Sequence, residues 1–221
     1  MKRFFAIIFL LVFSNYCIAS SEAATHLRKM LLKYRSLTVY EDNGKLVNEY
    51  TKKNNKKRLS VVKFNTVYIE NESLLFNWEK VLSDIYKKLK PPLKAAKYTI
   101  KKDKSVVKVK FRSNKFELVS NLNAALSRAT GISSGLSWMV PRYLSPELGV
   151  SPRFGASELT LMEINDKFIK IELNYNYGRT RVVTMYIDRK SYLLKKYEKR
   201  SQLKNGTKTY RVITYNVIKY K

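Results

Sequence analysis

The chain has 221 residues but few of the side chains that catalysis and metal binding use, since it contains one cysteine and one histidine. A single thiol, Cys17, cannot close a disulfide within the chain, and a structural zinc site takes four ligands, mostly Cys and His. A nucleophilic Ser or Cys would have only His26, close to the N-terminus, as its histidine base. We therefore expect no enzyme, no catalytic residues, no metal and no other cofactor.

Two weaker catalytic patterns have simpler explanations. Glu163 and Asp166 could act as a hydrolytic carboxylate pair, but solvated acids beside a turn account for them better. The segment Gly131–Gly135 is rich in Gly and Ser, yet it lacks the Gly-Lys-Ser/Thr ending of a phosphate-binding loop and has no parallel strand before it. A turn between two helices is the better interpretation of this segment.

Acidic residues are also scarce, because 17 Asp and Glu stand against 44 Lys and Arg, for a formal charge of +27. The basic residues are spread along the chain, apart from one basic cluster: Lys52, Lys53, Lys56, Lys57 and Arg58. On an exported protein, such charge favours an anionic membrane or envelope surface as the partner, and not nucleic acid. A genome whose codons favour Lys, Asn and Tyr would give the same composition, so both explanations stay open.

No hydrophobic run is long enough to span a bilayer, which takes about 20 residues. The longest, Phe4–Phe13, follows a Lys-Arg pair and precedes small residues, which is the pattern of a secretory signal peptide. Cleavage is possible after Ala19 or after Ala23, and we divide the chain into a signal peptide, 1–23, and one periplasmic domain, 24–221. Cys17 leaves with the signal, and the residues before it depart from a lipobox, so we expect neither acylation nor a disulfide.

Period-two alternation of apolar residues dominates the rest of the chain and predicts strands. The expected strands are 36–41, 45–50, 59–69, 74–78, 98–101, 106–111, 116–119, 158–164, 168–175, 181–188, 191–201 and 207–220. Asp42-Asn43-Gly44 is typical of a hairpin turn. Helical spacing predicts helices at Leu27–Tyr34 and Leu122–Ala129, the second with Gly131 as a C-cap, a short helix within Val81–Leu89, and an interrupted one at Ser137–Leu144.

The order of these elements indicates the fold class. Helices are confined to the start and the middle, while strands follow each other at short intervals, which favours one large antiparallel sheet. Val107, Val109 and Phe111 alternate with Lys108 and Lys110, so one face of the sheet is dry and the other wet. We expect a mainly antiparallel β protein, with a few helices that cover the dry face.

Several segments resemble the LolA-like superfamily, and within it a group of periplasmic proteins of unknown function. They are the hairpin Val182–Tyr197 (VVTMYIDRKSYLLKKY), the strand Leu74–Trp78, and Ala124–Gly135 with its continuation Val140–Leu144. The resemblance extends over nearly the whole mature chain through loose motifs. The segment Val81–Lys97 and the high positive charge depart from it.

The resemblance implies a curved sheet, an incomplete β-barrel plugged by helices, whose concave face shelters the acyl chains of lipids or lipoproteins. Each buried CH₂ of such a chain contributes roughly 0.8 kcal/mol. The residues expected to line the cavity are Phe76, Trp78, Val107, Val109, Phe111, Leu126, Trp138, Met139, Ile169, Ile171, Met185 and Ile187.

Two functions remain open at this point. The first is a periplasmic carrier or binding protein that holds a lipid or lipoprotein acyl chain in the half-barrel. The second is a structural or interaction module of the envelope, with a closed core and a basic surface.

Overall fold

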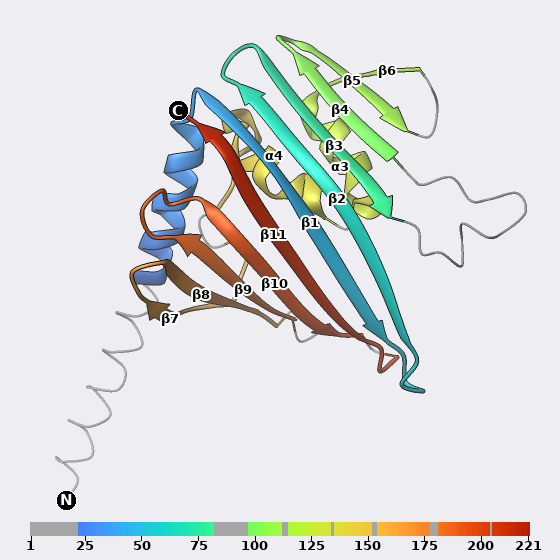
Figure 1. The fold of residues 1–221 in the computed structure, drawn as a ribbon, viewed down its shortest axis with the longest axis vertical. Coiled ribbons are helices and arrows are strands. Elements are labelled where there is room, and N and C mark those ends of the chain that lie inside the picture. The colour runs from blue at the N-terminus through green and yellow to red at the C-terminus, as the bar shows by residue number, and fades with distance from the viewer. Residues whose placement is uncertain are drawn as a thin grey trace, which may run out of the picture.

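A computed structural model describes residues 22–81, 97–111, 115–133, 135–151, 154–176, 181–203 and 205–221. Within them the chain forms one antiparallel sheet in the order β6-β5-β4-β3-β2-β1-β11-β10-β9-β8-β7. The strands are β1 (Val39–Thr51), β2 (Lys57–Ile69), β3 (Ser73–Val81), β4 (Lys97–Asp103), β5 (Val106–Phe111), β6 (Glu117–Val119), β7 (Glu158–Ile164), β8 (Phe168–Tyr175), β9 (Arg181–Asp188), β10 (Leu194–Gln202) and β11 (Lys208–Tyr220). The sheet is curved and unclosed (Figure 1), which confirms the predicted fold class.

The sheet consists of two runs of hairpins that meet in its middle. Strands β1 to β6 pair in chain order on one side, and β7 to β11 do so on the other. The two runs are joined by the pairing of the first strand with the last, in which Leu46 lies opposite Ile213 and Asn48 opposite Arg211. The outer strands, β6 and β7, are therefore the free edges of the half-barrel.

Helices cover one face of this sheet, its concave side (Figure 1). They are helix 22–35, α3 (Leu122–Ile132), η1 (Leu136–Trp138), α4 (Val140–Tyr143) and η2 (Pro146–Leu148). The predicted apolar stripe of helix 22–35 is buried, including Leu27, Met30 and Tyr34. The Asn121 side chain caps α3 by accepting a 2.9 Å hydrogen bond from the backbone N–H of Ala124. Both expected main helices are thus confirmed, and no described helix is long and apolar enough to cross a membrane.

The hairpin turn predicted at Asp42-Asn43-Gly44 is wrong, because β1 runs straight through these residues. The Asp42 carboxylate accepts hydrogen bonds from the Tyr40 hydroxyl, at 2.7 Å, and from the backbone N–H of Thr66, at 2.9 Å. Gly44 makes room for the Phe64 side chain, since a Cβ at position 44 would overlap that ring. Contacts with the neighbouring strand therefore override a local turn signal.

Two other boundaries differ from the predictions. Gly131 is not a C-cap, because α3 continues to Ile132 and Ser133 takes the cap, where its N–H donates to the Ala129 carbonyl at 2.8 Å. The return strand of the Val182–Tyr197 hairpin begins only at Leu194, since the Asp188 carboxylate accepts from the N–H and the hydroxyl of Ser191 and widens the turn. The helix expected within Val81–Leu89 lies outside the described residues, except for Val81, which ends β3.

Candidate functional site

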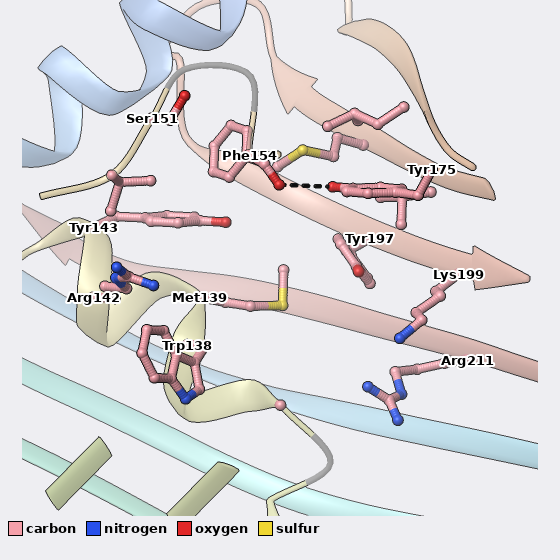
Figure 2. A pocket seen from close by; sticks show the side chains of 15 residues that line it. Trp138, Met139, Arg142, Tyr143, Ser151, Phe154, Tyr175, Tyr197, Lys199 and Arg211 are labelled. Atoms are coloured by element: carbon pink, nitrogen blue, oxygen red, sulfur yellow. Dashed lines mark hydrogen bonds between the residues drawn. The ribbon is translucent and has the colours of Figure 1, made fainter. Parts of the chain in front are cut away.

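A cavity of about 400 Å³ lies between the helical cover and the C-terminal half of the sheet (Figure 2). Its cover comes from η1, α4 and the loop that follows, and its floor from β8, β9, β10 and β11. The lining residues are Gly135, Trp138, Met139, Arg142, Tyr143, Val150, Ser151, Phe154, Leu173, Tyr175, Val183, Met185, Tyr197, Lys199 and Arg211.

The floor is built from side chains in cross-strand register, which alternation along each strand turns toward the cover. One row across the sheet is apolar: Ile171, Met185, Tyr197, Ile213 and Leu46. The next row contains two positively charged side chains, and we call it the cationic row: Leu173, Val183, Lys199, Arg211 and Asn48. Moving two residues along β10 and β11 therefore takes the inner face from an apolar to a cationic surface.

The cover contributes mostly apolar groups, held in place by aromatic contacts. The ring of Tyr143 packs edge-on against that of Phe154, with centroids 5.6 Å apart. The Tyr175 hydroxyl donates a 3.3 Å hydrogen bond to the Phe154 carbonyl, drawn as a dashed line in Figure 2, and so ties the loop to β8. The Tyr215 hydroxyl lies 3.4 Å from the Met139 sulfur. This side of the cavity therefore offers an apolar wall of fixed shape.

Arg142 belongs to the cover and holds the loop that follows α4. Its guanidinium stacks on the Trp138 ring, 4.1 Å from the centroid. It also donates to the carbonyl oxygens of Leu148, at 3.2 Å, and Gly149, at 3.0 Å. The charge of Arg142 is thus engaged in holding the cover together.

Two other cations, Lys199 and Arg211, face the cavity from neighbouring strands, directly opposite each other in the ladder. The Arg211 Nε donates a 2.6 Å hydrogen bond to the Asn48 side-chain oxygen. Burial, together with the charges of Arg181 and Arg211, lowers the pKa of Lys199 to about 8. Burial also lowers the pKa of Arg211. This end of the cavity is therefore positively charged and partly shielded from water.

The structure brings three of the predicted lining residues to this cavity: Trp138, Met139 and Met185. The other predicted positions lie elsewhere in or beside the core, namely Phe76, Trp78, Val107, Val109, Phe111, Leu126, Ile169, Ile171 and Ile187. All of these are buried except Phe111, which is half-buried. Trp78, for example, stacks on Tyr98, whose hydroxyl donates to the Ala125 carbonyl of α3 at 3.4 Å. Their contact with a ligand stays a prediction.

The sequence reasoning missed the cationic end of the cavity, although part of the signal was present. Lys199 is two residues from Tyr197 on β10, and Leu173 is two residues from Ile171 on β8, so each pair lies on the same face of its strand. Those patterns assign a strand face to each residue. They do not show that Lys199 lies opposite Arg211, because the register between distant strands is set by the whole sheet.

The basic cluster, Lys52 to Arg58, spans the exposed turn between β1 and β2 (Figure 1) and the first two residues of β2, and none of its residues lines the cavity. The turn is closed by a 3.0 Å hydrogen bond from the backbone N–H of Lys52 to the Lys56 carbonyl. Lys57 forms a surface ion pair with Glu49 at 3.1 Å. The predicted contact of this cluster with an anionic surface stays a prediction. Among the described residues, no group of His, Cys, Asp and Glu has the makings of a metal site.

No protein-family model matches the chain, and no curated protein matches it. Among solved structures, it resembles a LolA superfamily protein from Nitrosomonas europaea, with 10% identity, 86% of this chain and 90% of that chain covered, and a TM-score of 0.28. A protein domain from Vibrio parahaemolyticus, named for outer-membrane lipoprotein sorting, shows 7% identity, coverage of 91% and 93%, and a TM-score of 0.35.

The Pseudomonas aeruginosa complex of MucA and MucB gives 10% identity and a TM-score of 0.46, with 90% of this chain and 58% of that chain covered. The chain therefore spans a little over half the length of that neighbour. The solved structures similar to this protein thus include a LolA superfamily member.

Proposed function

We propose that the protein is a non-enzymatic binding protein of the cell envelope, which holds an acyl chain between its sheet and its helical cover. The observation that carries this proposal is the cavity of about 400 Å³ on the covered face. Small-molecule sites are typically largely apolar pockets of about 300–1,000 Å³ with a few polar groups. The Met139, Phe154, Val183 and Met185 side chains give this cavity that composition.

The volume sets the size of the ligand. A CH₂ group occupies about as much space as a water molecule, roughly 30 Å³, so the cavity holds a chain of about a dozen carbon atoms. At roughly 0.8 kcal/mol per CH₂, burying that chain is worth about 10 kcal/mol relative to water. A membrane offers its lipids a similar gain, so transfer between membrane and cavity is nearly balanced and therefore reversible.

The periplasm is the compartment in which such a carrier would act, and residues 1–23 carry the signal pattern that supports export. The cargo is an acyl chain from a lipid or a lipoprotein. A chain of this size, enclosed by protein, can cross an aqueous space that it would not cross freely.

The test is displacement of a fluorescent fatty acid from the mature protein, together with native mass spectrometry of gently purified material. Val183→Phe places a ring in the cavity and should weaken binding at least about tenfold, because filling the space removes the ligand's contacts. Thr184→Phe is the matched control, since its side chain points to the opposite face of the same strand.

Circular dichroism and the melting temperature show whether both variants fold. Retained probe affinity in a folded Val183→Phe would contradict the position of the site. Failure of the wild type to bind any lipid probe at micromolar concentration would remove the carrier function and favour an envelope module with a closed core.

A further inference from the structure

We propose that the cavity selects single-chain amphiphiles with an anionic head, and that Lys199 and Arg211 bind that head while the apolar row beside them receives the tail. The inference rests on the proposed function and adds to it the chemical class of the ligand. Lys199 and Arg211 lie opposite each other on β10 and β11, and both line the cavity. Figure 2 shows the ends of the two side chains close together at one end of it.

The charges of the described lining residues at this end of the cavity are positive, and those that act on Lys199 are the charges of Arg181 and Arg211. Like charges directly opposite on neighbouring strands are unfavourable, and burial increases the cost. None of the described residues that line the cavity is Asp or Glu. Arg181, diagonally adjacent to Lys199, adds a third positive charge nearby. An oxyanion that enters here would gain from all of these charges.

Arg211 and Lys199 also have the chemistry that binds an oxyanion. Arg211 is oriented by its hydrogen bonds with Asn48 and Tyr50, and a planar guanidinium is the cationic group that best matches the geometry of a carboxylate or a phosphate. Lys199 supplies a flexible point charge. Its pKa of about 8, lowered by burial, leaves most of the molecules protonated at neutral pH, and a bound anion would raise this pKa.

The position of the cations explains how head and tail fit together. On β10, Tyr197 of the apolar row is two residues from Lys199 of the cationic row. On β9, Met185 is likewise two residues from Val183. A ligand with its head at Lys199 thus has an apolar surface directly beside it, under Met139 and the rest of the cover. Arg142, at the other side of the cavity, is engaged with Trp138 and with backbone carbonyls.

The experiment compares three ligands with the same tail: dodecanoate, dodecyl phosphate and dodecanol. Each is titrated against the mature protein below its micelle-forming concentration, in competition with the same fluorescent probe. Charge-assisted hydrogen bonds predict that the wild type binds at least one anionic ligand about tenfold or more tightly than dodecanol. A preference for dodecanoate would identify a carboxylate head, and a preference for dodecyl phosphate a phosphate head.

Lys199→Gln should weaken anion binding about tenfold and dodecanol binding much less, because a charged head loses more than a neutral hydroxyl when the cation is removed. Arg200→Gln is the matched control: it removes the same charge from the next residue of β10, whose exposed side chain lies on the other face and stacks on Tyr210. This variant should keep the wild-type preference. Arg211→Lys retains the charge but not the planar fork, and should fall between wild type and Lys199→Gln.

Two outcomes are distinguishable. Equal affinity of the wild type for dodecanol and for both anions, or an unchanged preference in a folded Lys199→Gln, would overturn head-group selection and leave the acyl-chain cavity standing. Binding of none of the three ligands would overturn the proposed function together with this inference.

Discussion

Asp42 is a carboxylic acid that the fold buries completely, on strand β1 at the centre of the sheet. Burial raises its pKa to about 6, and hydrogen bonds from Tyr40 and Thr66 oppose that rise. Because the unfolded value is 3.8, the folded protein binds this proton more tightly than the unfolded chain does. The resulting stabilisation is fully present below about pH 4 and is lost as the pH rises through about 6.

Asp42→Asn should remove this pH dependence, because the amide does not titrate. From pH 4 to pH 8, the wild type should lose about 2.5 kcal/mol of unfolding free energy relative to the variant. Urea denaturation at both pH values measures this difference. Asp103→Asn, at the exposed end of β4, is the matched control and should follow the wild type. Parallel pH profiles for wild type and Asp42→Asn would contradict the prediction.

The same residues show where local sequence signals fail. Asp-Asn-Gly is among the strongest hairpin signals known from short sequences, yet here it lies inside a strand. Its Asp is bonded to Tyr40 and Thr66, and its Gly accommodates the Phe64 ring. The two partners on β2, Thr66 and Phe64, are too distant in sequence to belong to a local turn at residues 42–44. Only the paired register of β1 and β2 brings them together, and a local pattern carries no information about that register.

Helix 22–35 bears on where the predicted signal peptide would be cleaved. In the structure Ala23 is fully buried within the hydrophobic core, and the Glu22 carboxylate lies 3.9 Å from His26 on the next turn. Cleavage after Ala23 would take both residues away from the helix. Cleavage after Ala19 would leave this first turn complete.

We therefore expect Ser20 to be the first residue of the mature protein. Intact-mass measurement and N-terminal sequencing of periplasmic material test this directly. A mature chain that begins at Ala24 would contradict the prediction, as would a mass for the full-length chain.

Helices and most strands were predictable because each repeats one short-range pattern over several turns or residues. The stripe of Leu27, Met30 and Tyr34 needs only the helical period to be recognised, and all three are buried as expected. Ser133 as the cap of α3 was not predictable, since Gly131 carried the stronger C-cap signal. Element type was thus a local property, whereas several of the boundaries were not.

The whole molecule carries a large positive charge, and the basic cluster at the β1–β2 turn is its densest segment. Replacing Lys52, Lys53, Lys56 and Lys57 by Gln should weaken binding to anionic liposomes more than about tenfold, at about 1 kcal/mol per lysine near the surface. Folding should be unaffected because all four side chains are exposed. Salt should also weaken the binding, because exposed charges are screened over about 8 Å at physiological ionic strength.

Liposome sedimentation at low and high salt measures the effect. The matched control removes the same charge from four exposed lysines on and beside β4 and β5, with Gln at Lys101, Lys104, Lys108 and Lys115. If this control loses as much binding as the cluster variant, the cluster has no special role and the protein's overall charge is responsible. Binding that neither variant weakens would contradict any role for surface lysines.

The candidate site was predictable only in part, for a reason that applies to the molecule as a whole. Trp138, Met139 and Met185 follow from apolar residues on the covered side. The charged end of the cavity depends on β10 pairing with β11 and on β11 pairing with β1, where Arg211 meets Asn48. That last contact joins residues 163 positions apart in sequence.

The pairing of β1 with β11 also constrains when the protein can fold. The sheet's central strand pair joins β1 to β11, so the half-barrel is incomplete until β11 has been synthesised. Contacts of such large sequence separation form slowly, because the entropy of closing the loop is lost before the contact is gained. A polypeptide that cannot finish folding early stays unfolded for longer, and a secretion channel requires its substrates to be unfolded.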